Sequence, residues 1–202
     1  MHRSRQGISR LALASGGLLA VGALATVAAV VDYADVYVEL DADRNGFDIR
    51  VAGSTEPGWE PTDESWDQGS PDAYEVALDA GTALAPGGSL ALRIAVHNSS
   101  QRLPALLSLT IRDPSPRGLA TDPATGRYRE LFDQAVFTVS EGGERLLDRV
   151  PAHALETYTW PMPLAADAQV VLDVEIGLPE SVDNRWQEAT TTVQFHFTAE
   201  NS

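Results

Sequence analysis

The residues best suited to bind a ligand form a short acidic run early in the chain. Oxygen-bearing side chains alternate there and a glycine follows them: Asp41, Asp43, Asn45 and Gly46. This spacing matches the first half of an EF-hand calcium loop. Asp48 supplies a further oxygen, but the bidentate glutamate of such a loop would fall at Ala52. The run is therefore an incomplete calcium site, and we favour the alternative of an acidic hairpin turn.

The residue types needed for hydrolysis occur without the spacing that hydrolysis requires. A zinc peptidase commonly places two histidines on one helical face as His-Glu-x-x-His, and a serine hydrolase often carries Gly-x-Ser-x-Gly. Neither pattern occurs, and the histidines of the predicted strands and loops lie far apart: His97, His153 and His196. We therefore expect no catalytic residue, no zinc site and no cofactor apart from the calcium candidate.

The charge of the chain excludes one large class of partners. The 202 residues contain 29 acidic side chains and 14 basic ones, which gives a net charge of −15. Such a surface repels phosphate backbones, so nucleic-acid binding is not expected. All basic side chains other than histidine are arginines, and there is no cysteine, so an exported domain must be held together by burial alone.

The first residues have the organisation of a secretory signal peptide. Arg3, Arg5 and Arg10 form a basic region, and residues 11–31 carry no charge. Ala23-Leu24-Ala25 provides the small residues of a cleavage site, so we place the cut between Ala25 and Thr26. The alternative is an uncleaved segment kept as a membrane anchor, because the uncharged run reaches the ~20 residues of a spanning helix. We expect a secreted protein.

Apolar and polar residues alternate with period two through most of the remaining chain, which is typical of half-buried β-strands. The expected strands cover residues 36–40, 47–51, 73–78, 90–96, 107–111, 137–139, 146–147, 170–176 and 193–197. Loops rich in Pro, Gly and acids are expected at 54–72 and 113–126, a short helix at 128–134, and a turn at Glu141-Gly142-Gly143-Glu144. We expect the strands 90–96 and 107–111 to be neighbours at the centre of a sheet. The fold class predicted is all-β, a jelly-roll or Ig-like sandwich with long crossover loops, formed by residues 36–202 as one domain.

Several short motifs, in their order and spacing, resemble the TasA/camelysin family of exported bacterial surface proteins. The segment Phe47–Ser54 looks like the second strand of that family, and Pro86-Gly87-Gly88-Ser89 resembles its turn before a strand ending in Asn98. The other similar segments are Leu131-Phe132, Phe137–Val139, Leu178–Glu180, Asn184–Gln187 and Val193–Ala199. The long signal ending in Ala-x-Ala also resembles those cut by a SipW-type signal peptidase.

The resemblance implies a jelly-roll subunit of extracellular fibres, of a biofilm matrix or of the cell surface. Family members assemble when an N-terminal strand of one subunit completes the sheet of the next. Residues 26–35 form the corresponding arm here, and the valines suited to pairing with a neighbour's sheet edge are Val27, Val30, Val31, Val36 and Val38. The expected partners are therefore further copies of the chain and a SipW-type signal peptidase.

Two other functions stay open at this point. One branch of the family is described as metalloendopeptidases, and the absence of ligand spacing counts against that activity here. The other is a monomeric calcium- or glycan-binding module, in which Trp59 and Trp66 of the acidic loop would stack on sugars. We favour the interpretation that both tryptophans cover an edge of the core.

Overall fold

The computed structural model of the chain describes residues 31–34, 48–68, 84–186 and 189–201. The chain divides into two compact units, 1–30 and 31–202, and every described residue belongs to the second. Within this described part, no helix is long and apolar enough to cross a membrane. The predicted signal segment and its cleavage site lie outside the described residues, as do four residues of the predicted assembly strand: Val27, Val30, Val36 and Val38.

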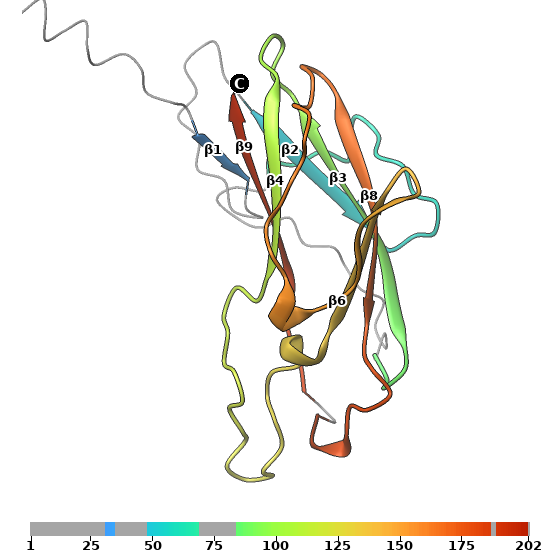
Figure 1. Cartoon of the computed structure of the whole chain (residues 1–202), viewed down its shortest axis with the longest axis vertical. Helices are drawn as coiled ribbons and strands as arrows, with labels where there is room; N and C mark the ends of the chain where they lie inside the picture. The colour runs from blue at the N-terminus through green and yellow to red at the C-terminus, as the bar shows by residue number, and fades with distance from the viewer. Residues whose placement is uncertain (1–30, 35–47, 69–83, 187–188, 202) are drawn as a thin grey trace, which may run out of the picture. The chain divides into compact units, whose positions relative to one another are not determined.

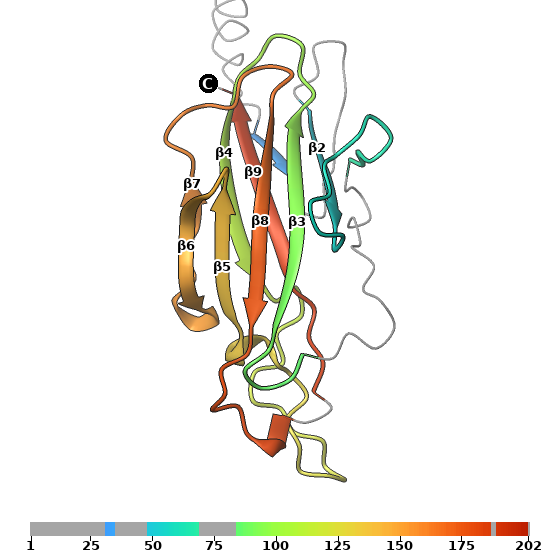
Figure 2. The same ribbon diagram turned by 90° about the vertical axis from the view of Figure 1, so that its right-hand side faces the viewer.

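Two antiparallel sheets form the domain, which confirms the all-β prediction (Figures 1 and 2). The first sheet has the strand order β1 (Val31–Ala34), β9 (Gln194–Asn201), β4 (Ala105–Arg112) and β7 (Tyr158–Thr159). The second has the order β2 (Ile49–Ser54), β3 (Ser89–Asn98), β8 (Gln169–Gly177), β5 (Val136–Glu141) and β6 (Glu144–Pro151). The only helical segments described are three 3₁₀ turns, η1 (Phe132–Gln134), η2 (Ala152–Ala154) and η3 (Asn184–Trp186).

One hydrophobic core lies between the sheets, and the predicted alternation accounts for its members. Apolar residues at alternate positions of β3 and β4 are buried in this core: Leu92, Ile94, Val96, Leu107, Leu109 and Ile111. Phenylalanines from both sheets are buried among them, Phe137 from β5 and Phe197 from β9. Burial of such large apolar side chains stabilises the fold by ~1.5–3 kcal/mol each.

The prediction that residues 90–96 and 107–111 are neighbours in one sheet is wrong. β3 pairs with β2 and β8, whereas β4 pairs with β9 and β7 in the other sheet. Residues 99–104 carry the chain from one sheet to the other. Alternation shows which face of a strand is buried, but a sandwich buries the inner faces of both sheets equally. The pattern therefore contained no information on pairing.

Other local predictions are confirmed or corrected in detail. The turn between β5 and β6 has two consecutive glycines with positive φ, Gly142 at 55° and Gly143 at 88°, as a tight hairpin requires. The helix expected at 128–134 is only the η1 turn, because Tyr128 forms a β-bridge with Thr121 instead. The expected hairpin turn at Asn45-Gly46 and the expected strand 73–78 lie outside the described residues.

The side chain of Asn98 connects two of the segments in which the chain passes between the sheets, the one after β3 and the one before β8. Asn98 is fully buried, and its Nδ2 donates hydrogen bonds to the carbonyl oxygens of Leu103, Leu164 and Ala165, at 2.8, 3.2 and 3.1 Å. Its Oδ1 accepts from the backbone N–H of Ser100 at 3.2 Å. Asn98-Ser99-Ser100 has the form of a glycosylation sequon, but a buried amide with this set of partners forms a turn, as its turn-forming residues predict.

We expect the substitution Asn98→Asp to destabilise the domain by more than about 2 kcal/mol, because a carboxylate would face three carbonyl oxygens with no proton to donate. Asn201→Asp is the matched control, since the same change is made at an exposed position at the end of β9. Urea unfolding followed by circular dichroism measures both variants. Equal unfolding midpoints for the two would show that the Asn98 amide does not hold the crossings together.

Candidate functional site

The strand β1 forms an edge of the first sheet and is the part of the predicted assembly arm that the structure describes. Its four residues pair antiparallel with β9, from Val31 opposite Glu200 to Ala34 opposite Phe197. Among the described strands, β9 is its only partner in the sheet. Only a few main-chain hydrogen bonds therefore hold β1 in the sheet. Another strand with suitable side chains can form the same bonds with β9.

The other described edges of the sheets are blunted in several ways. β7 is only two residues long. Val51 of β2 exchanges two backbone hydrogen bonds with Asp67 at 2.8 and 2.9 Å, so the 55–68 loop covers part of that strand. β6 pairs with β5 in an irregular register, and its Arg149 has a φ of 52°. Bulges, short strands and charged side chains of this kind hinder further strand pairing.

Asp48 is the only member of the predicted calcium site within the described residues, and its carboxylate holds a turn. Oδ2 accepts a 2.7 Å hydrogen bond from the Ser99 hydroxyl and lies 3.6 Å from Nε of Arg50. The backbone N–H of Asp48 donates to the Ser100 hydroxyl at 3.1 Å. Asp48 thus joins the start of β2 to the turn after β3. The other three candidate ligands lie outside the described residues: Asp41, Asp43 and Asn45.

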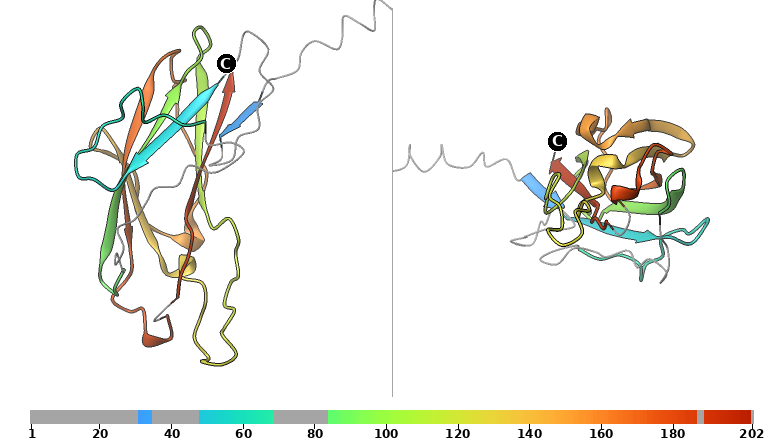
Figure 3. Two further views of the ribbon diagram at one scale, coloured as in Figure 1. Left: turned by 180° about the vertical axis from the view of Figure 1, so that it is seen from behind. Right: turned by 90° about the horizontal axis from the view of Figure 1, so that it is seen from below.

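The acidic 55–68 loop lies against the second sheet, beside β2 (Figure 3, left). Arg93 of β3 holds it by donating to the Trp59 carbonyl and pairing with Glu60 at 2.6 Å, while its Nε binds Asp173 of β8 at 2.8 Å. The Trp66 ring lies 5.1 Å from the ring of His97. Both tryptophans are half-buried, and neither belongs to the hydrophobic core, so the interpretation that they cover an edge of the core stays a prediction.

The histidines lie apart in the fold. His97 belongs to β3, where its Nε2 is 3.2 Å from a carboxylate oxygen of Asp167. His196 belongs to β9 of the other sheet, and burial lowers its pKa. His153 is exposed in η2. In the part of the chain that the structure describes, no group of three or more His, Asp or Glu side chains is arranged to hold a metal ion.

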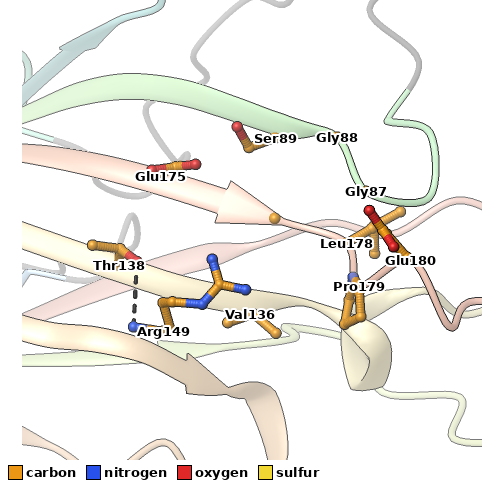
Figure 4. Close-up of a pocket in the computed structure, with 11 residues that line it drawn as sticks. Gly87, Gly88, Ser89, Val136, Thr138, Arg149, Glu175, Leu178, Pro179 and Glu180 are labelled. Atoms are coloured by element: carbon orange, nitrogen blue, oxygen red, sulfur yellow. Dashed lines mark hydrogen bonds between the residues drawn. The ribbon is translucent and has the colours of Figure 1, made fainter.

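A cavity of about 270 Å³ opens at the end of the second sheet, between the turn before β3 and the hairpin β5–β6 (Figure 4). The Arg149 side chain extends into it, and the backbone N–H of Arg149 donates to the Thr138 hydroxyl at 3.3 Å. Glu175 and Glu180 line the same cavity. One guanidinium between two carboxylates gives no excess positive charge for an anion, and no nucleophile with a neighbouring base lies among the lining residues.

Two carboxyl groups meet where the long crossover 113–131 leaves β4 and where it reaches η1. Glu130 is only 4% exposed, and its Oε1 accepts hydrogen bonds from the N–H groups of Leu131 and Phe132 at 3.0 and 3.2 Å. Asp113 Oδ1 accepts from the N–H of Ser115 at 2.7 Å, while its buried Oδ2 has no donor. A proton shared with Glu130 would satisfy that oxygen.

The electrostatics of the pair agree with such sharing. Burial, followed by the interaction with Glu130, raises the pKa of Asp113. Burial acts to raise the pKa of Glu130 too, but hydrogen bonds with Thr191, Asp113 and two backbone N–H groups outweigh it and lower that pKa. Asp113 is therefore the group that carries the proton. Sequence reasoning missed this pair because Asp113 lies at the start of the expected loop 113–126 and Glu130 in the expected helix 128–134, and nothing in the pattern brings the two together.

We expect Asp113→Asn to stabilise the domain by about 1 kcal/mol at pH 7, because the amide keeps the Ser115 bond and donates to Glu130 without ionising. A raised pKa in the folded state means that the contribution of Asp113 to stability is complete below the ordinary aspartate pKa and lost as the pH rises through the raised value. The gain should therefore vanish near pH 3. Urea midpoints at both pH values measure it, with exposed Asp133→Asn as control. A gain that is independent of pH would contradict a shared proton.

Comparison of the chain with protein-family models, with curated proteins and with solved structures finds no match. The resemblance to the TasA/camelysin family consequently stays a prediction that depends on the short motifs alone. The features from which a function can be inferred are the short edge strand β1, the loops fixed on the sheets and the distribution of charge.

Proposed function

We propose that the protein is an exported structural subunit that associates with further copies of itself by exchanging the strand β1. The single observation that carries this proposal is the position of β1 as a four-residue edge strand paired with β9 alone among the described strands. An element at the edge of a sheet and near one end of a compact unit can be replaced by the same element of another copy with little change in contacts. The products are dimers if the exchange is mutual and fibres if it is sequential.

The finer features of this proposal come from the sequence. They are a jelly-roll or Ig-like arrangement of the two sheets, removal of residues 1–25 by a SipW-type signal peptidase, and a place in a biofilm matrix or at the cell surface. Cleavage before Thr26 would leave a chain end only a few residues before β1, which begins at Val31. A strand close to a free end can leave its sheet without unfolding the rest of the domain. The residues of the arm then pair with β9 of the next copy.

The energetics favour exchange over the loss of pairing. β9 contributes Phe197 and Ala199 to the core, and these residues lie opposite Ala34 and Asp32 of β1. When β1 departs, main-chain groups of β9 lose their partners at an edge that is otherwise well ordered on its β4 side. The unpaired N–H and C=O groups of such an edge are a template for another strand. The β1 strand of another copy restores the lost hydrogen bonds. The unpaired edge of β9 therefore favours binding of the same strand from a second copy.

We expect an engineered disulfide between β1 and β9 to stop association, because it fixes β1 in its own sheet. The substitutions are Tyr33→Cys and Thr198→Cys, at positions directly opposite each other. Opposite residues of antiparallel strands have Cα atoms ~4.5–5.5 Å apart, which a disulfide can span. The chain contains no cysteine that would compete. Size-exclusion chromatography and electron microscopy of the chain from Thr26 should show particles of one copy when oxidised and assemblies when reduced.

The matched control places the disulfide elsewhere in the same sheet. Ser108→Cys and Thr159→Cys join β4 to β7, where the two native hydroxyl groups are 2.9 Å apart. This variant should assemble whether oxidised or reduced. When the Tyr33/Thr198 variant is oxidised after assembly, its disulfides should join different copies and give a ladder on a non-reducing gel. Assembly that is indifferent to the β1–β9 disulfide would contradict strand exchange.

A further inference from the structure

Arginines are concentrated in one segment of a strongly acidic protein. Residues 112–129 contain four of them, Arg112, Arg117, Arg127 and Arg129, and only two acidic residues, Asp113 and Asp122. By contrast, the 55–68 loop has five acidic residues and no basic one: Glu56, Glu60, Asp63, Glu64 and Asp67. The two charged surfaces belong to different loops of one domain, and they have opposite sign.

The crossover that carries the arginines is fixed in place by backbone bonds. Asp122 N–H donates to the Arg127 carbonyl at 2.8 Å, and Arg129 N–H donates to the Ala120 carbonyl at 3.0 Å. Between these bonds the Tyr128 ring stacks on Trp186 of η3, with 4.4 Å between ring centroids. The segment therefore forms a short hairpin anchored by Tyr128, and the two arginines that flank Tyr128 have defined positions.

A cavity of about 190 Å³ lies beside this hairpin, and we call it the arginine pocket. Among the described residues, its lining contains three arginines, Arg117, Arg127 and Arg129, and one carboxylate, that of Asp122, which pairs with Arg129 at 3.2 Å. Arginines therefore outnumber carboxylates in the described lining, in a protein that is otherwise acidic. A guanidinium binds a carboxylate through two parallel N–H groups, so a pocket of this size and charge suits carboxylate side chains.

The acidic loop of the same copy is not placed to fill the pocket. The loop is bound to β2 and β3 near Val51 and His97. The 113–131 crossover lies at the opposite end of the sheets (Figure 1). Three of its acidic residues are exposed and have no ion pair with a described residue: Glu56, Asp63 and Glu64. Their carboxylates are therefore presented to solvent by a loop that is itself anchored through Arg93.

We propose that the arginine pocket of one copy binds the acidic 55–68 loop of a second copy. This contact rests on the proposed self-association and adds to it a surface that orients successive copies. Leu119, 65% exposed on the same crossover, supplies apolar area next to the charged groups. A protein with net charge −15 repels its own copies in most orientations, so the contact of opposite charges selects one relative orientation.

A charge-exchange experiment tests this contact. Arg117→Glu with Arg127→Glu reverses the pocket, and Glu56→Arg with Asp63→Arg and Glu64→Arg reverses the loop. Each variant alone should associate at least tenfold more weakly than the unmodified chain in sedimentation equilibrium. An equimolar mixture should associate as the unmodified chain does, because each reversed surface then meets its complement. Arg145→Glu on β6 is the control and should leave association unchanged, and urea unfolding checks that every variant folds.

The outcomes separate this contact from strand exchange. With β1 fixed to β9 by the disulfide, the copies that run singly in size-exclusion chromatography should still form, at the higher concentrations of sedimentation equilibrium, a weak and salt-sensitive pair that the pocket reversal abolishes. A mixture that fails to recover association would overturn the proposal. So would unchanged association of the pocket variant together with its loss of binding to vesicles of anionic lipid, since the pocket would then serve a membrane surface.

Discussion

The buried amide of Asn98 is the constraint on which the arrangement of the two sheets depends. It binds carbonyl groups from two of the segments in which the chain crosses between sheets, residues 99–104 and 160–168. The backbone of Asn98 also pairs with Ala168 and Asp167, at 2.9 Å each. The domain has no disulfides. The hydrogen bonds of Asn98 and the apolar core between the sheets must therefore together fix how the two sheets are arranged. A single side chain thus sets the distance between two crossings that lie far apart in sequence.

Charged and aromatic side chains have the same role for the long loops. Arg93 fixes the acidic loop on the outer face of β3 by binding Glu60 and the Trp59 carbonyl. Glu130 and Tyr128 fix the crossover by binding backbone N–H groups and by stacking on Trp186. Loops held in this way present their remaining charges in defined positions. Surfaces without regular secondary structure can therefore be specific in what they bind.

Much of the strand pattern could be predicted from the sequence, since alternation follows directly from burying one face of each strand. The turn at Gly142-Gly143 was predictable for a similar reason, because only glycine adopts positive φ without strain. Pairing was not predictable, and β3 and β4 show why: both have buried inner faces and yet belong to different sheets. The Asp113–Glu130 pair was equally hidden, because its meeting depends on where a crossover ends. Of the predicted calcium ligands, only Asp48 could be placed, and it serves a turn.

If copies associate by exchanging β1 as proposed, the irregular pairing of β5 with β6 has a consequence for the direction in which an assembly would grow. Strand addition at both edges of a sheet would spread copies sideways into layers or amorphous deposits. The bulged register of β6 and the left-handed backbone at Arg149 close one side to such addition, while the two residues of β7 offer almost nothing to another strand. Growth restricted to β9 would proceed along a single line. The assemblies would be filaments of uniform width. The number of available copies would set their length, and the dimensions of the folded domain would set their width.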